Sequence, residues 1–203
     1  MKKNLFLFSL LLIFSVACTP ITKSDNISLY AELDYQTMIK KVKTPEEVAW
    51  YLQNYLHYQN DNVRRSFKYV HKRKCGICAE YAFSAAALLS DNNYPPLILH
   101  VLLGNSPDNI QVTHALYVYQ DNVTRRWGSL GQQRENILPK FKTLKEMCLY
   151  FNDQKFYSQK IVAYKLHNIS RFNFIDGEDK EIYKFWSSGK KIILANTEKN
   201  LNN

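Results

Sequence analysis

The sequence has few of the features that mark repetitive or disulfide-stapled proteins. Its 203 residues contain no repeat, no low-complexity tract and no internal linker, so one domain is the simplest organisation. Cysteine is scarce, with four in the whole chain. Three of them, Cys75, Cys78 and Cys148, lie beyond residue 18, and an odd number does not suit a disulfide framework. At least one thiol should therefore be free.

No apolar run is long enough to cross a membrane comfortably. The longest, from Leu5 to Val16, falls short of the about 20 residues that a transmembrane helix needs. It follows two lysines and ends at Ala17-Cys18, which is the order of a secretory signal. We therefore expect residues 1–17 to be a signal peptide and the protein to be exported.

The residues around the expected cleavage point resemble the lipobox of bacterial lipoproteins. Ser-Val-Ala precedes Cys18, although Ser15 stands where that motif usually has leucine. The resemblance implies cleavage before Cys18 and lipid on its thiol, hence a membrane-anchored lipoprotein of the bacterial cell envelope. Residues 18–30 would be a polar tether, 31–195 the domain and 196–203 a polar tail. Plain secretion and an uncleaved anchor are the alternatives.

Acidic residues are outnumbered, with 18 against 27 lysines and arginines. Removal of residues 1–17, which hold two lysines and no acid, lowers the formal net charge from +9 to +7. This balance suits an anionic membrane face, an envelope polymer or an acidic partner. An ordinary solvated surface explains it equally well. Nucleic acid is not an expected partner outside the cytoplasm.

The pattern along the chain predicts an α+β domain, with helices first and a small antiparallel sheet after them. Thr44 and Glu47 can form a capping box around Pro45, and Thr143 and Glu146 a second one. These signals place helices after Thr44 and after Thr143, and alanine-rich helical spacing places another from Cys78. Apolar or alternating runs predict strands at 97–103, at 115–119, around Trp127 and at 160–166.

Cys78 is the strongest candidate for a chemical group. It follows a glycine at the start of a helix, and the basic run 71–74 precedes it. A helix N-terminus and nearby cations favour thiolate over thiol, and the same amides can hold an oxyanion. A thiolate nucleophile needs a base close in space. The simpler interpretation is that Cys78 is a small buried core residue with no chemical role.

His114 is the best-placed base among the five histidines. It opens the predicted strand 115–119 after a polar loop, at a sheet rim where a side chain can face a cleft. We expect His57 on the first helix, His71 in solvent, and His100 and His167 within or at the end of strands. For His114, as for Cys78, a purely structural role is the simpler interpretation.

The segment Gly76-Ile77-Cys78-Ala79-Glu80-Tyr81-Ala82 resembles the G-x-C-x-[DE]-[YF]-A signature of the bacterial transglutaminase-like superfamily. Thr113-His114-Ala115 and then Trp127 follow in the family's order, and the resemblance covers roughly residues 44–152. It implies a papain-like, transglutaminase-like core that catalyses acyl transfer as a peptidase, deamidase or transamidase. Cys78 would be the nucleophile and His114 the general base. The substrate would be a peptide or protein, and no cofactor or metal is expected.

The resemblance has two departures. The acid that orients the histidine is expected about four residues after Trp127, where this chain has Gly131. Ser129, which shares a strand face with Trp127, or Gln132 could accept from the imidazole instead. Ile77 replaces an acidic residue often found before the cysteine. Without a carboxylate, activity should be low or absent, so an inactive module that binds peptide or envelope polymer is an alternative.

Two alternative functions would use the same cysteines. Cys75-Gly-Ile-Cys78 is a C-x-x-C pattern, which would suit a thiol–disulfide oxidoreductase if a strand preceded it and helices alternated with strands after it. A disulfide between the two could also switch the nucleophile off. Zinc held by His71, Cys75, Cys78 and His114 has ligands of a suitable type but no paired second half.

Overall fold

The computed structural model describes residues 32–60, 63–133, 135–178, 186 and 189–194. The expected signal peptide, lipid-bearing Cys18 and polar tail lie outside these residues. The first part of the chain is helical apart from two short strands: α2 (Tyr35–Lys41), α3 (Pro45–Asn54), β1 (His57–Tyr58), α4 (Phe67–Arg73), β2 (Cys75–Gly76), α5 (Cys78–Leu89) and η1 (Ser90–Asn92). The rest is mainly strand: β3 (Leu97–Ser106), β4 (Asn109–Gln120), β5 (Trp127–Leu130), β6 (Ile137–Phe141), α6 (Leu144–Asp153), β7 (Ile161–Asn168) and β8 (Lys191–Ile193).

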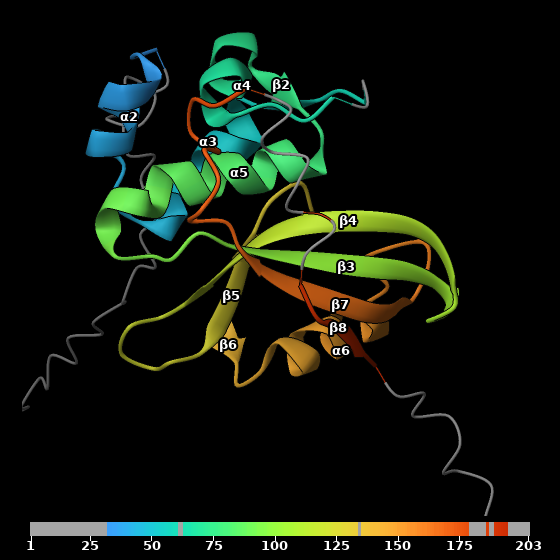
Figure 1. Cartoon of the computed structure of the whole chain (residues 1–203). Helices are drawn as coiled ribbons and strands as arrows, with labels where there is room; N and C mark the ends of the chain where they lie inside the picture. Colours follow the sequence, from blue (N-terminus) through green and yellow to red (C-terminus); the bar gives the residue numbers. More distant parts are fainter. Residues whose placement is uncertain (1–31, 61–62, 134, 179–185, 187–188, 195–203) are drawn as a thin grey trace, which may run out of the picture.

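A six-stranded sheet in the order β6-β5-β4-β3-β7-β8 forms the centre of the fold. All neighbouring strands in it are antiparallel. Helices α2 to α5 lie over one face of the sheet and α6 lies under the other (Figure 1). The predicted α+β class, with helices first and an antiparallel sheet after them, is confirmed.

Helix α5 lies at the centre of the helical layer. All of its residues except Cys78 are buried. Its alanines are small enough to let it approach the sheet and the flanking helices closely, and it contacts α2, α3, α4 and β4. This burial fixes the direction of α5, so the position of its first residue is set by the core.

The capping box predicted at Thr44 is confirmed, whereas at Thr143 the Glu146 carboxylate accepts from Lys142 N instead of closing the predicted box. Thr44 accepts from Glu47 N at 3.2 Å and the Glu47 carboxylate accepts from Thr44 N at 3.1 Å, which closes the capping box of α3. Thr143 likewise accepts from Glu146 N at 3.1 Å at the start of α6. Each cap satisfies amides that a helix leaves unpaired at its N-terminus.

The segment predicted as a polar loop before His114 is mostly strand. Strands β3 and β4 form one long hairpin whose turn lies at Pro107 and Asp108, so His114 lies within β4 and not at its start. The register shifts at Gly104, where a side-chain carbon would lie 2.1 Å from the Asn109 carbonyl oxygen. The loop prediction was wrong because polar, solvent-exposed residues of this hairpin hide the strand period.

Seven described elements were not predicted from the sequence: α2, β1, α4, β2, η1, β6 and β8. The stretch before Cys75, expected to be at most a short strand, is helix α4, whose buried side is formed by Phe67, Val70 and His71. It ends at Lys74, which has a left-handed φ of 57°. A chain that turns through this conformation can pass directly into the short strand β2 and then into α5.

The core consists of two clusters, one on each face of the sheet. Ala115, Tyr117 and Tyr119 of β4 pack with the helical layer, whereas Leu116 and Val118 pack with α6. This alternation is the period of two expected of a strand buried on both faces. Within the described part of the chain, none of the helices combines the length and apolar character that a membrane crossing requires.

Candidate active site

Cys78 is the first residue of α5, and the chain enters the helix through an extended Ile77 with φ −89° and ψ 174°. The amide of Ile77 donates to Glu80 Oε2 at 2.8 Å, which holds the first turn closed. The other carboxylate oxygen accepts from Arg65 N at 2.8 Å and from the Arg65 guanidinium at 3.3 Å. Glu80 is fully buried. This carboxylate therefore joins the segment before α4 to the turn that carries Cys78.

Gly76 makes room for that carboxylate. A side-chain carbon at this position would lie 2.7 Å from Glu80 Oε2 and 2.8 Å from Glu80 Cβ, closer than such atoms approach in folded proteins. Gly76 and Glu80 of the G-x-C-x-E segment therefore act together, because the glycine leaves the space that the carboxylate occupies. Their physical task is to set the position of Cys78.

The thiol of Cys78 reaches the edge of β4. The main-chain amides of Ala115 and Ala79 lie close enough to this thiol to lower its pKa against the effect of burial. Pairing of β4 with β5 ends at Tyr117 and Leu130, while β3 stays paired to β4 past His114. The edge of β4 that faces β5 is therefore open beside Ala115, and the short side chain of Ala115 allows the helix start to come close.

His114 precedes Ala115 on the same strand, so its side chain belongs to the opposite face of β4. Burial lowers the pKa of His114 from 6.5 to about 4, and the main-chain carbonyl of Gln132 opposes this shift as a hydrogen-bond acceptor for the imidazole. At neutral pH the ring is uncharged, which leaves one nitrogen lone pair to act as a base. Cys78 at the start of α5 therefore lies near Ala115, and His114 is the residue before Ala115 on β4.

The resting charge state differs from the sequence prediction. Burial raises the pKa of Cys78, and the amides of Ala115 and Ala79 and the charge of Arg64 oppose this increase without overcoming it. The lysines and arginine of the run 71–74 are not among these causes. At neutral pH the site therefore holds a thiol beside a neutral imidazole, not the thiolate expected at a helix N-terminus.

Ser129 occupies a different place from the one predicted for it. It is fully buried, and its hydroxyl donates to Gln133 Oε1 at 3.3 Å. The Gln133 amide in turn donates to the Ser129 carbonyl at 3.0 Å. The pKa of His114 is lowered by burial and raised in part by the main-chain carbonyl of Gln132, while the Ser129 hydroxyl is bonded to Gln133. A main-chain acceptor leaves no signature in a sequence.

Tyr157 is a site residue that the sequence did not indicate. Its ring centroid lies 5.1 Å from that of His114, and its hydroxyl is buried with no hydrogen-bond partner in the described part of the chain. Burial raises the pKa of Tyr157, and the negative charges of Cys148 and then of Cys78, when ionised, add to the shift. The tyrosine comes from the segment between α6 and β7, far along the chain, so only the fold brings it here.

Two of the other histidines differ from their predicted settings. His57 lies in β1 and is exposed, not on the first helix. His71 is buried instead of solvated: its ring lies 2.8 Å from the Tyr51 hydroxyl and 2.7 Å from the Leu33 carbonyl oxygen. Its two nitrogens are occupied by these partners. Across the described residues, no three His, Cys, Asp or Glu side chains are grouped to hold a metal, which contradicts the zinc alternative.

The oxidoreductase alternative also conflicts with the fold. Helix α4 precedes Cys75, and the six-stranded sheet consists of antiparallel neighbours instead of alternating parallel strands and helices. Cys75, Cys78 and Cys148 are free thiols, and Cys75 donates to Gln59 Oε1 at 3.0 Å. The C-x-x-C spacing thus arises from a two-residue strand followed at once by a helix start.

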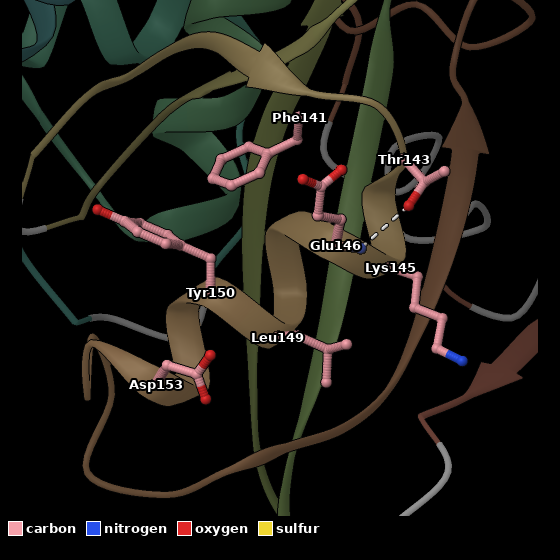
Figure 2. A pocket seen from close by; sticks show the side chains of 7 residues that line it. All are labelled: Phe141, Thr143, Lys145, Glu146, Leu149, Tyr150 and Asp153. Carbon is pink, nitrogen blue, oxygen red and sulfur yellow. Dashed lines mark hydrogen bonds between the residues drawn. The ribbon is translucent and has the colours of Figure 1, made fainter. Parts of the chain in front are cut away.

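Two surface pockets differ in volume and in the side chains that line them. A pocket of about 280 Å³ is lined by His114 and Tyr157. A larger hollow of about 410 Å³ lies over α6, where Glu146, Tyr150 and Asp153 point toward it (Figure 2). Glu146 already accepts from Lys142 N at 2.8 Å as part of the helix start. His114 lines the first pocket and not the second, so the site of interest is the first.

Comparison with known proteins supports the resemblance seen in the sequence. Residues 22–121 match the family DUF553, described as a transglutaminase-like domain. Among solved structures the chain is similar to one described as "Legionella pneumophila LapG (EGTA-treated)", at 13% sequence identity and a TM-score of 0.40, over 79% of this chain and 81% of that one. No curated protein matches the chain. The family match contains Cys78 and His114 and begins within the segment 18–30 expected to be a tether.

Proposed function

We propose that this chain, whose residues 22–121 match a transglutaminase-like domain, is a cysteine-dependent acyl-transfer enzyme that acts on a peptide or protein outside the cytoplasm. One observation carries the proposal: the partly buried Cys78, first residue of α5, lies near Ala115, the residue next to His114, at the open edge of β4. The nucleophile and the base thus belong to one small region, supported by a helix start and a strand. A cysteine peptidase or a deamidase would use the same arrangement.

The proposed reaction begins from the neutral pair. As the Cys78 sulfur attacks the acyl carbon, its proton passes to His114, and the carbonyl oxygen becomes an oxyanion. Main-chain amides at the start of α5 can donate to this oxyanion. The imidazolium then gives its proton to the leaving amine, the carbon–nitrogen bond breaks, and a thioester to Cys78 remains. Water or an amine attacks the thioester, its proton passes through His114, and the thiol is regenerated.

The Gln132 carbonyl determines how well this cycle can run. A neutral acceptor orients the imidazole, but it stabilises the imidazolium less than a carboxylate would. We therefore expect slow turnover. The same observation favours a second candidate, an inactive relative that binds peptide or envelope polymer at the same place.

The test compares Cys78→Ala, His114→Ala and Cys75→Ser proteins. Release of fluorescent peptides from labelled casein reports hydrolysis, and incorporation of a fluorescent amine into casein reports transfer. We expect both signals to be lost in Cys78→Ala and His114→Ala, with unchanged far-UV circular dichroism, and retained in Cys75→Ser. A folded Cys78→Ala protein with full turnover would exclude this mechanism. No turnover in the unaltered protein, with casein binding retained, would favour the binding module.

The location of the protein is a second part of the proposal. Export by residues 1–17 and lipid on Cys18 would hold the domain at a bacterial envelope membrane through a short polar tether, and the formal charge of +7 after cleavage suits an anionic surface. A Cys18→Ala protein should leave the membrane fraction and lose label from radioactive palmitate. Retention in the membrane without label would indicate an uncleaved anchor.

A further inference from the structure

The pocket of about 280 Å³ beside His114 has a particular lining. Leu103 and Val112, on the two strands of the β3–β4 hairpin, form one wall, and residues 156–159 from the segment before β7 form the other. His114 closes one part of it. The pocket is large enough for one side chain or a small polar group, and its apolar walls come from both elements.

Three buried polar atoms in this lining have no hydrogen-bond partner in the described part of the chain: His114 Nε2, the Tyr157 hydroxyl and Gln159 Oε1. The Gln159 amide nitrogen donates to Gln111, which fixes the orientation of that side chain. Leaving a buried polar atom unpaired costs about 1–3 kcal/mol. Three such atoms around one pocket indicate a place for a ligand that can both donate and accept hydrogen bonds.

The lining is also uncharged. No Asp, Glu, Lys or Arg is among its residues. His114, with its pKa of about 4, is neutral at physiological pH, and Tyr157, whose pKa is raised by burial, is neutral as well. A charged ligand group would lose its hydration here without gaining a counter-ion, which is costly.

The pocket adjoins the proposed catalytic residues through His114, which lines it and whose ring lies against that of Tyr157. We infer that this pocket is a subsite for an uncharged hydrogen-bonding group of the acyl substrate, an amide or a hydroxyl, and that Tyr157 and Gln159 bind it. The inference rests on the proposed function in taking Cys78 as the reactive group.

Two alkylating reagents of nearly equal shape test the inference without requiring turnover. Iodoacetamide presents an amide and iodoacetate a carboxylate, and both attach to a thiol with loss of iodide. Rates at Cys78 and at Cys75 are measured on the same full-length protein by mass spectrometry. We expect the rate ratio of iodoacetamide to iodoacetate to be about tenfold higher at Cys78 than at Cys75, because only the uncharged reagent is bound by neutral partners.

Variants connect that preference to the pocket. Tyr157→Phe keeps the ring packing and removes the hydroxyl, and we expect it to lower the Cys78 ratio about fivefold. Gln159→Lys introduces a cation and should raise the iodoacetate rate selectively. Tyr58→Phe, an exposed change in β1, should leave the ratio unaltered. Circular dichroism checks that each variant is folded.

Equal ratios at Cys78 and Cys75, or a Cys78 ratio that Tyr157→Phe leaves unchanged, would overturn the inference. A preference for iodoacetate at Cys78 would also overturn it, and would mean that the charge of Arg64 governs recognition. These outcomes are separate from failure of the proposed function. If the protein shows no turnover but still prefers iodoacetamide at Cys78, the subsite is supported and only the proposed enzymatic activity is rejected.

Discussion

The buried carboxylate of Glu80 gives the sharpest prediction about how this fold positions its thiol. Glu80→Ala removes acceptors for three donors, namely the Ile77 amide, the Arg65 amide and the Arg65 guanidinium. Breaking a buried ion pair from one side costs about 3–5 kcal/mol. Because the Arg65 guanidinium is partly exposed and can regain water, we expect a loss of about 3 kcal/mol in the free energy of unfolding.

The chain contains a matched control for this change. Glu146 occupies the same third position of its helix as Glu80 does in α5, but it is exposed and accepts from the Lys142 amide in a solvated setting. Glu146→Ala should therefore cost only about 0.5–1 kcal/mol. Glu80→Gln should fall between the two, since it keeps one acceptor oxygen but sets an amide N–H₂ against a donor.

Urea unfolding followed by far-UV circular dichroism measures all three variants, with linear extrapolation to water. Alkylation of Cys78 serves as a second readout, because loosening the first turn of α5 should expose the thiol and raise its rate. If Glu80→Ala is within 1 kcal/mol of Glu146→Ala, the carboxylate does not hold the turn. An unchanged alkylation rate in a destabilised Glu80→Ala protein would separate stability from positioning.

Three further outcomes are expected. His100 and His114, with pKa values of about 3 and about 4, stay neutral in the fold, so stability is fully present above about pH 6.5 and is lost as pH falls through those values, by up to about 1.4 kcal/mol per pH unit for each. Urea midpoints between pH 7 and pH 4 measure this, and His100→Gln should flatten the slope. Iodoacetamide should modify Cys78 with a pH midpoint above that of free cysteine, and a midpoint below pH 8 would indicate an ion pair instead. Tyr51→Phe, which removes a buried hydrogen bond to a histidine, should lower the free energy of unfolding by about 1–2 kcal/mol, whereas exposed Tyr58→Phe should not.

The parts of the fold that the sequence predicted are those with strong local signals. Thr44 and Thr143 cap helices, and such caps are predictable because they involve residues only three positions apart. The apolar run at 97–103 is a buried strand, as its composition predicted. The hairpin around Gln111 was wrongly predicted to be a loop because its residues are exposed or only partly buried, the apolar Val112 among them. His71 was misplaced because its partner Tyr51 comes from another helix, which a local pattern does not reveal.

The candidate site divides in the same way. Cys78 and His114 could be found from residue type, spacing and a helix start. The Gln132 carbonyl could not, because every residue has one and only the end of the β4–β5 pairing places this one at the imidazole. Tyr157 lies on a segment between elements, and its relation to Cys78 depends on how α6 packs under the sheet. The charge state of Cys78 was predicted wrongly because it depends on how deeply the thiol is buried, which the sequence does not give.

Because the rest of α5 is buried, its first residue is held in place by the core. One wall of the pocket beside His114, residues 156–159, belongs to a connecting segment, and such segments tolerate changes in length and composition. In the proposed enzyme, the reactive sulfur and the residues that select the substrate therefore belong to different parts of the molecule. Altering that connection is the route by which relatives could acquire new preferences, or an engineer could install them, while the sulfur stays where it is.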